Sequence, residues 1–209
     1  MGVPLGAWAA GTPRRLPHGD VVVRQGDPIE SLFLVTSGVV RLSAVTREGR
    51  EVVVGLLGVG DLFGESALLG EPSPVEARAI CSADVVALPL EHVREILHRH
   101  PATSGQLLRL VASRLHRTSQ ALQEAMVGTV TTRVSSRLCD LAEMTGVPAP
   151  DGIRIGLPLT QDEIARMVGA TREAVNRSLG GLVSRGLVKT EGRTIVIPDP
   201  EALQSGPVV

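Results

Sequence analysis

Two arginines and a glutamate near the C-terminus have the side-chain types and the spacing needed to recognise base pairs in DNA. Arg172 and Glu173 are adjacent, and Arg177 follows within the next turn of a helix. One guanidinium can donate to both O6 and N7 of a guanine, and a carboxylate can accept from the amino group of a cytosine. The alternative is a solvated helix face whose charges pair with one another. The elements around these residues decide between the two.

The segment that contains these residues predicts a helix–turn–helix. The run Thr160-Gln161-Asp162-Glu163 matches a capping box, which begins a helix after Thr160. Gly169 permits a tight turn, and Thr171 is the N-cap of a second helix. Because the first turns of the second helix enter the major groove in this motif, they carry the predicted base readers. Supporting contacts to DNA are expected from Thr160, Thr171 and Asn176.

Apolar residues at helical spacing give both helices an inward face. They are Ile164, Ala165 and Val168 in the first helix, and Val175, Leu179, Leu182 and Val183 in the second. Residues 187–190 and 193–197, separated by Glu191-Gly192, predict a two-stranded wing. Capping box, glycine turn, second cap and wing together favour DNA binding over a solvated helix face.

Composition excludes several other classes of protein. The 209 residues include 21 Lys and Arg against 22 Asp and Glu, a net charge of −1, so the chain as a whole is no polycation. One Trp, two Phe and no Tyr are too few rings to stack the bases of single-stranded RNA. Two cysteines cannot form a disulfide scaffold, a four-cysteine zinc site or a four-thiolate iron–sulfur cluster.

Metal binding, membrane insertion and catalysis are not expected. His92, His98 and His100 are interpreted as solvated side chains near a helix end, so no metal site is predicted. The longest apolar run, Val52–Gly60, is far shorter than the ~20 residues that cross a bilayer. Neither a Walker loop, a Gly-x-Ser-x-Gly turn nor a Cys/His dyad occurs, which argues against an enzyme. We expect a cytoplasmic protein.

The N-terminal half predicts an antiparallel β-roll. Short β-rich runs are separated by glycine turns between His18 and Pro89. The runs are 21–23, 32–35, 39–45, 51–57 and 83–88. From about Glu91 the pattern becomes helical, with a short helix over 91–99. The predicted domains are therefore a sensor domain over 1–100, a helix over 101–128 and a DNA-binding domain over 129–209.

The long helix predicted from Ala102 to Val127 has the heptad spacing of a two-helix coiled coil. Its narrow apolar stripe includes Leu108, Val111, Leu115 and Leu122. A helix packed on its own domain would show similar spacing, but the narrowness of the stripe favours a dimer seam. A further helix is predicted over 129–144, followed by a Pro- and Gly-rich loop over 147–158.

Taken together, these segments resemble the cyclic-AMP receptor protein and fumarate–nitrate regulator superfamily of bacterial transcription factors. The resemblance runs from about His18 to Pro198. It is carried by Gly19-Asp20, Gly26-Asp27, Gly38, 58–65 (GVGDLFGE), 160–165 (TQDEIA) and 171–177 (TREAVNR). It implies an α+β chain with an N-terminal cyclic-nucleotide-type β-roll, a long dimerisation helix and a C-terminal winged helix. It also matches Arg172, Glu173 and Arg177 to the three base readers of the cyclic-AMP branch, which recognises palindromic TGTGA-like half-sites.

The same resemblance implies an effector pocket that is only partly retained. Gly64 and Glu65 match the residues that hold the ribose, and Thr118 and Ser119 match the pair that binds adenine. The phosphate-binding Arg and Ser fall on Val75 and Glu76 instead. A cyclic phosphate needs a cluster of donors, so an apolar side chain and a carboxylate are unsuitable partners. Arg78 is three residues further along, and an odd shift along a strand points a side chain to the other face.

We therefore expect a homodimeric, sequence-specific transcription activator that binds double-stranded DNA, contacts RNA polymerase and does not depend strongly on cyclic AMP. No bound cofactor is predicted, although cyclic AMP or another small effector could act. The alternative is a cyclic-nucleotide-responsive subunit that regulates a partner protein. Such a subunit would keep the phosphate-binding arginine and would not need a winged helix, whereas this chain has the reverse.

Overall fold

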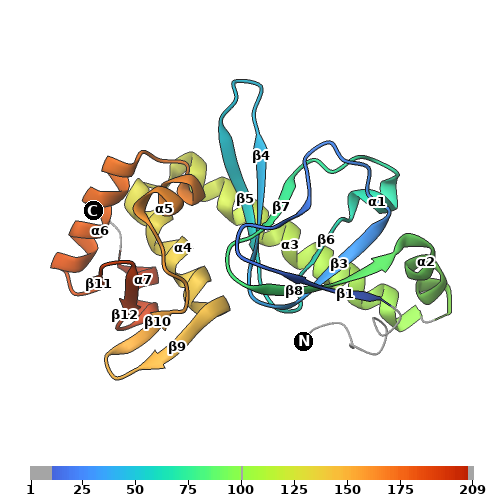
Figure 1. The fold of residues 1–209 in the computed structure, drawn as a ribbon. Coiled ribbons are helices and arrows are strands. Elements are labelled where there is room, and N and C mark those ends of the chain that lie inside the picture. Colours follow the sequence, from blue (N-terminus) through green and yellow to red (C-terminus); the bar gives the residue numbers. More distant parts are fainter. Residues whose placement is uncertain (1–10, 100, 207–209) are drawn as a thin grey trace. The chain divides into compact units, whose positions relative to one another are not determined.

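The chain divides into two compact units, residues 1–118 and 119–209. The computed structural model describes residues 11–99 and 101–206, so His100 lies outside the described residues. The division between the units lies within one long helix, α3 (Pro101–Val127), which runs on from the first unit into the second (Figure 1). The predicted long helix is therefore present.

Strands of the first unit form two four-stranded antiparallel sheets. One sheet has the order β1-β8-β3-β6 and the other β2-β7-β4-β5. The strands are β1 (Thr12–Leu16), β2 (Val21–Val23), β3 (Ser31–Ser37), β4 (Val40–Val45), β5 (Glu51–Leu57), β6 (Leu62–Phe63), β7 (Glu76–Ala79) and β8 (Ala83–Pro89). The predicted β-roll is confirmed, and the sequence analysis missed β1, β6 and β7.

The two sheets enclose an aliphatic core with one aromatic pair. Phe33 of β3 and Phe63 of β6 stack with their ring centroids 4.8 Å apart. Leu42 of β4 and Val85 of β8 are completely buried beside them. Because apolar burial is the main favourable term in folding, this core fixes the glycine-rich turns that surround it.

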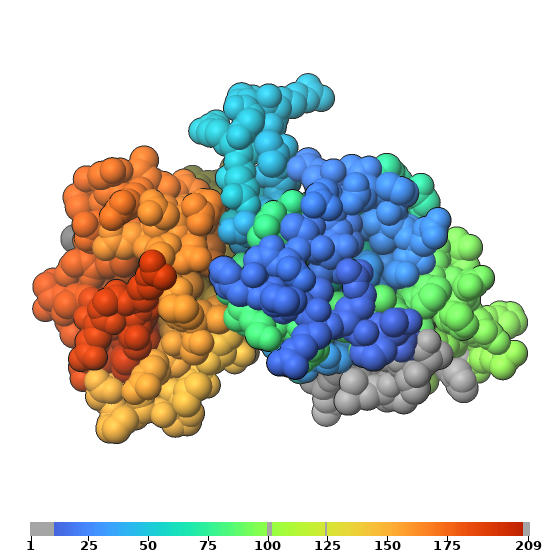
Figure 2. All heavy atoms as spheres, in the orientation of Figure 1, coloured from blue at the N-terminus to red at the C-terminus, as the bar shows by residue number. Residues whose placement is uncertain are grey.

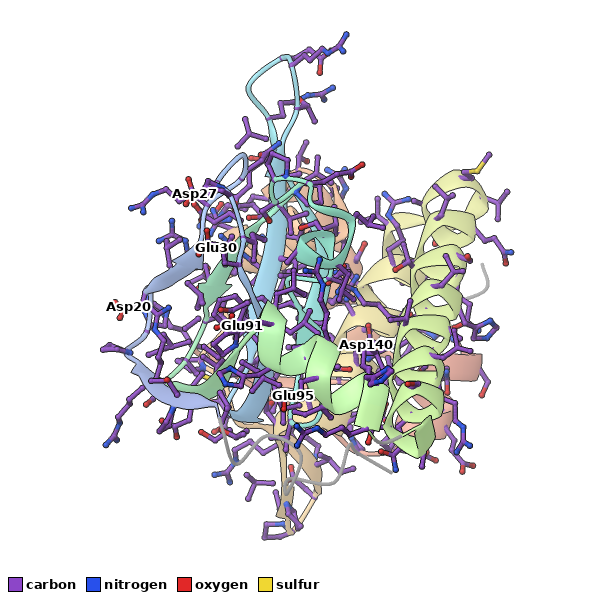
Figure 3. All side chains as sticks on the ribbon, turned by 90° about the vertical axis from the view of Figure 1, so that its right-hand side faces the viewer. Asp20, Asp27, Glu30, Glu91, Glu95 and Asp140 are labelled. Carbon is purple, nitrogen blue, oxygen red and sulfur yellow. The ribbon has the colours of Figure 1, made fainter. Side chains whose placement is uncertain are left out.

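Three helices complete the first unit. They are α1 (Ser66–Leu69), α2 (Leu90–Arg99) and the first part of α3. A second apolar cluster joins Val93 of α2 to the sheet residues Leu32 and Leu88, and Leu107 and Leu110 of α3 pack against it. Glu91 and Glu95 lie on the exposed side of α2, whereas Asp20, Asp27 and Glu30 lie across the β-roll from α3 (Figure 3). The apolar contacts of Leu107 and Leu110 hold the first part of α3 against the roll.

The β4–β5 hairpin extends beyond the rest of the roll (Figures 1 and 2). Next to its turn, the hairpin contacts Gln25, whose Oε1 accepts from the Val45 amide at 2.7 Å. Val52 and Val54 are partly exposed on the hairpin. Val40, Leu42 and Leu57 at one end of the hairpin belong to the core, whereas the end that carries the turn extends beyond it.

The second unit is a winged helix with a four-stranded antiparallel sheet of order β11-β12-β10-β9. After the end of α3, its elements are α4 (Val130–Thr145), β9 (Gly146–Ala149), β10 (Gly152–Ile155), α5 (Gln161–Val168), α6 (Arg172–Ser184), β11 (Lys189–Glu191), β12 (Thr194–Ile197) and α7 (Pro200–Ser205). Its core includes the buried side chains of Val134 and Leu138 on α4, Ile164 on α5, Leu182 on α6 and Ile197 on β12. The α+β fold class is confirmed.

Two local predictions in this unit are wrong. Residues 147–158 were expected to form a loop, but β9 and β10 form a hairpin there, with Pro148 opposite Ile153. Proline is tolerated because β9 is an edge strand, where a missing amide donor breaks no central ladder. Val183 was expected on the inward face of α6 but is 41% exposed. It lies beside the buried Leu182 and just outside the buried face.

Candidate functional site

Helix α5 begins with the capping box that the sequence predicts. The backbone amide of Thr160 donates to Glu163 Oε2 at 2.7 Å, and the amide of Glu163 donates to Thr160 Oγ1 at 3.2 Å. At the other end, Gly169 adopts a left-handed φ of +62°. Side chains resist this conformation, so glycine ends α5 and turns the chain toward α6.

Helix α6 presents the predicted base readers to solvent. The hydroxyl of Thr171 caps the helix by accepting from the Ala174 amide at 3.2 Å. Arg172, Glu173, Asn176 and Arg177 are all exposed on the first two turns. Buried apolar groups of α6 face the other way. The sequence and the local geometry thus agree that these polar tips are available to a ligand.

Helix α4 is hydrogen-bonded to both α5 and α6. The Thr131 hydroxyl donates to Ser178 Oγ on α6 at 3.1 Å. Arg133 donates through Nε to the carbonyl of Val168 at 2.9 Å, and through Nη1 to the carbonyl of Gly128 at 3.0 Å. Two carbonyls at helix ends are thereby satisfied by one guanidinium. These hydrogen bonds connect α4 to both α5 and α6.

Charges near the start of α6 alternate in sign. Arg172 Nη1 lies 3.8 Å from Asp162 Oδ2 of α5, and both side chains are more than half exposed. The pKa of the Glu173 carboxyl is lowered by its own backbone amide first and by the Thr171 hydroxyl second, with Arg172 and Arg177 adding a smaller effect. Glu173 therefore remains a carboxylate, the form that accepts hydrogen bonds.

The wing is connected to the β9–β10 turn by an ion pair. Lys189 Nζ of β11 lies 2.7 Å from Asp151 Oδ2. This contact lowers the pKa of Asp151, mainly through the hydrogen bond from Lys189. Both side chains are about half exposed, so the pair orders the wing and adds little to stability.

The first unit contains a small cavity of about 40 Å³ beside β6 and α1, enough for a few water molecules. Gly64 and Glu65 line it together with Val75, as the sequence predicts. Gly64 has a φ of +88°, and a Cβ there would lie 2.7 Å from the Ser31 carbonyl oxygen. Only glycine fits at this position without moving the backbone.

Several side chains expected at this pocket do not line the cavity. Glu76, which the resemblance places at the phosphate position, is absent from the cavity lining, and its Oε1 lies 2.7 Å from Arg78 Nη2. Both residues lie on the face of β7 opposite to the buried Ala77 and Ala79, and Arg78 also donates to the Gly19 carbonyl. Thr118 and Ser119 are exposed on α3 and are absent from the cavity lining.

Arg114 is a cavity residue that the sequence analysis missed. It reaches from α3 into the lining, where its Nη1 lies 2.8 Å from Glu65 Oε1 and 3.3 Å from the Leu62 carbonyl oxygen. Three residues along, Arg117 Nη2 pairs with Asp61 Oδ1 at 2.7 Å. Arg114 could have been predicted from its position one helical turn before Thr118, because that segment was already assigned to the effector pocket.

The predicted seam of α3 is exposed within the chain. Leu108 and Leu115 are 69% and 66% exposed, and Val111 and Leu122 are 45% and 61% exposed. Such a row of exposed aliphatic side chains is unusual on a monomer surface.

Both cysteines are free thiols of intermediate burial. Burial raises the pKa of the Cys139 thiol to about 11, and the charge of Asp140 adds to the increase. Burial also raises the pKa of Cys81, partly offset by a hydrogen bond from the Val39 amide. In the described ranges, no group of three or more His, Cys, Asp or Glu side chains could hold a metal ion. Within the same ranges, the helices are all too short or too polar to span a bilayer.

Two family models match most of the chain. Residues 13–100 match the cyclic nucleotide-binding domain, and residues 132–205 match the Crp-like helix-turn-helix domain. The first contains the cavity and the second contains α5 and α6. A cyclic nucleotide-binding domain followed by a helix-turn-helix domain defines a transcription regulator and not an enzyme.

Relatives identify the family. The chain is 35% identical to the CRP-like cAMP-activated global transcriptional regulator of Mycobacterium tuberculosis over 209 residues, with 97% of this chain and 93% of that protein covered. It therefore belongs to the CRP/FNR family of transcription regulators. A CRP-family regulator from Thermus thermophilus is similar in structure, with a TM-score of 0.78, 25% identity and coverage of 91% and 94%. The c-di-GMP responsive global regulator CLP of Xanthomonas campestris has a TM-score of 0.76, 27% identity and coverage of 94% and 100%.

Proposed function

We propose that this protein is a homodimeric transcription activator that reads palindromic TGTGA-like half-sites. The observation that carries the proposal is the exposure of Arg172, Glu173 and Arg177 on the first two turns of α6. Two such helices in one dimer would enter successive major grooves about one helical turn apart. DNA as the target makes the cytoplasm the place of action, and we expect the activator to contact RNA polymerase.

Selection of binding sites from a random duplex pool tests this proposal. We expect the full-length protein to enrich inverted repeats whose half-sites resemble TGTGA. Recovery of single, non-repeated sites would argue against a dimer, and failure to enrich any sequence would refute specific recognition. Transcription by purified RNA polymerase from a promoter that carries the enriched site then distinguishes activation from repression.

Dimerisation is proposed to occur through α3. Leu108, Val111, Leu115 and Leu122 form the exposed apolar row that a second α3 would cover. The variant Leu115→Glu would place two carboxylates in the seam, so we expect it to sediment as a monomer and to lose cooperative binding to a palindrome. A dimer that survives this change would place the interface elsewhere.

Cyclic AMP is proposed to be a weak effector at most. Val75 lines the cavity at the position that the resemblance assigns to a phosphate-binding arginine. The names of the relatives also differ in their ligand, since one is cAMP-activated and another responds to c-di-GMP. The shared fold therefore does not by itself determine the effector. Isothermal titration with cyclic AMP should give no micromolar affinity, and a micromolar dissociation constant would overturn this part.

A further inference from the structure

Asp162 of α5 lies beside Arg172, the first residue of α6. Its Oδ2 lies 3.8 Å from Arg172 Nη1, and the two side chains are 55% and 63% exposed. Asp162 is the second residue of α5, so its backbone position is fixed by that helix. An anion is thereby held beside one of the predicted base readers.

Helix capping does not require the Asp162 side chain. Glu163 Oε2 accepts from both the amide and the hydroxyl of Thr160, and Thr160 Oγ1 accepts from the Glu163 amide. Both halves of the capping box are therefore complete. The Asp162 carboxylate remains available to act on Arg172.

The position of Arg172 at the start of α6 means that the Asp162 carboxylate can affect DNA binding. A cation in the first turn of a helix opposes the helix dipole, and the N-terminus of α6 with an exposed guanidinium would attract any phosphate. Contacts to phosphates carry no sequence information, whereas contacts to base edges do. Asp162 on α5 and Glu173 on α6 place two carboxylates around Arg172, and both repel the DNA backbone.

We propose that Asp162 is a specificity-determining residue that acts through Arg172. Its carboxylate competes with DNA phosphates for the guanidinium. A single phosphate offers Arg172 little gain over this ion pair, whereas O6 and N7 of a guanine offer two aligned acceptors. Binding to unrelated DNA is weakened more than binding to the preferred sequence. The inference rests on the proposed role of Arg172 as a base reader.

Fluorescence anisotropy with the full-length protein tests the inference. Wild type and D162N are titrated with the selected palindrome and with an unrelated duplex of equal length, at two salt concentrations. We expect D162N to bind the unrelated duplex about threefold to tenfold more tightly and the palindrome with a smaller gain. The salt dependence of binding to the unrelated duplex should steepen, because additional phosphates are contacted.

A matched control removes an equivalent charge elsewhere. Glu201 also lies in the first turn of a helix, α7, and is exposed. E201Q should leave the ratio of the two affinities unchanged, and D162E, which retains the carboxylate, should preserve the wild-type ratio. Thermal unfolding of each variant confirms that it is folded, and D162S serves as a second neutral variant if D162N is not.

Repeating the D162N measurement in a protein that also carries R172A shows whether the effect of D162N depends on the Arg172 guanidinium. There, D162N should change the affinity ratio no more than E201Q does, because the guanidinium that Asp162 holds is absent. An equal effect of D162N with and without Arg172, or an unchanged ratio in both, overturns the inference. If wild type itself prefers neither duplex, the proposed function fails instead, and that result is distinguishable from the first two.

Discussion

Polar side chains on the first two turns of α6 are exposed to solvent, whereas polar side chains at the cavity of the β-roll are paired with other residues. On α6, Glu173 and Arg177 point into solvent, and the hydrogen bonds that lower the pKa of Glu173 keep it ready to accept. At the cavity, Glu65 is held by Arg114. The Ser73 hydroxyl donates to the Val75 carbonyl at 2.6 Å.

The two regions therefore differ in how many existing contacts a ligand must break before it can bind. Exposed donors and acceptors on a surface bind with little rearrangement, and on α6 the contact to be broken is the exposed Arg172–Asp162 pair. A cavity whose polar groups already pair must lose those contacts when a ligand enters. The unit with α6 is therefore expected to determine specificity on its own. The roll would respond only to a ligand that compensates for the broken Glu65–Arg114 pair.

The largest expected effect comes from removing one base reader. Arg177→Ala should weaken binding to the preferred palindrome by about 1–3 kcal/mol and relax the preference at one base pair, because a bidentate contact to guanine is lost. Competition binding against a panel of single-base variants measures both effects.

Arg193 is exposed on the wing and provides the control. Arg193→Ala should weaken binding to all sequences to a similar extent, as expected for a phosphate contact. If Arg177→Ala shows that uniform loss instead, Arg177 contacts the backbone, and the contrast between α6 and the cavity loses its main support.

The second effect is a gain of function in the cavity. Val75→Arg should increase the affinity for cyclic AMP, because each charge-assisted hydrogen bond to the phosphate contributes about 1.5–3 kcal/mol. Isothermal titration compares this variant with Val52→Arg, which adds the same charge on the exposed hairpin. Equal affinities for the two variants would mean that Val75 does not occupy the phosphate position.

A smaller effect concerns pH and Glu173. Because its folded pKa is lowered, the carboxylate persists as pH falls, and its contribution disappears only when pH passes through that lowered value. Discrimination at the corresponding cytosine should stay constant from about pH 8 to about pH 5.5. Competition binding across this range tests the prediction, with Glu173→Gln as the uncharged reference. A loss of discrimination above the ordinary pKa of glutamate would show that another group controls it.

The smallest effect is expected at the wing. Asp151→Asn removes an exposed ion pair with Lys189 and should lower the melting temperature slightly, less so at high salt. The folded pKa of Asp151 is lowered, so the stabilisation exists above the unfolded pKa and is lost as pH falls through the folded value. Melting temperatures of wild type and variant should therefore converge in acid. A gap that widens in acid would contradict this assignment.

Local signals explain why the helix–turn–helix was predictable. A capping box, a glycine with positive φ and a second threonine cap depend on residues within one turn of each other, and Thr160, Gly169 and Thr171 have the predicted geometry. The β9–β10 hairpin was missed because Pro148 indicates a loop unless its strand is known to lie at a sheet edge.

Long-range contacts explain what was missed at the cavity. The Glu65–Arg114 pair joins residues far apart in the chain, and no periodicity reveals it. Glu76 was assigned to the pocket by position in a motif, whereas the alternation of β7 turns it toward Arg78.

The double hydrogen bond of Arg133 has a consequence for local unfolding. Its guanidinium joins the Gly128 carbonyl, just before α4, to the Val168 carbonyl at the end of α5. Opening either end leaves the same charged donor without one acceptor, so fraying at one place favours fraying at the other. Amide hydrogen exchange around residues 128–133 and 165–170 should then follow a shared opening equilibrium, and the two segments would behave as one cooperative foldon.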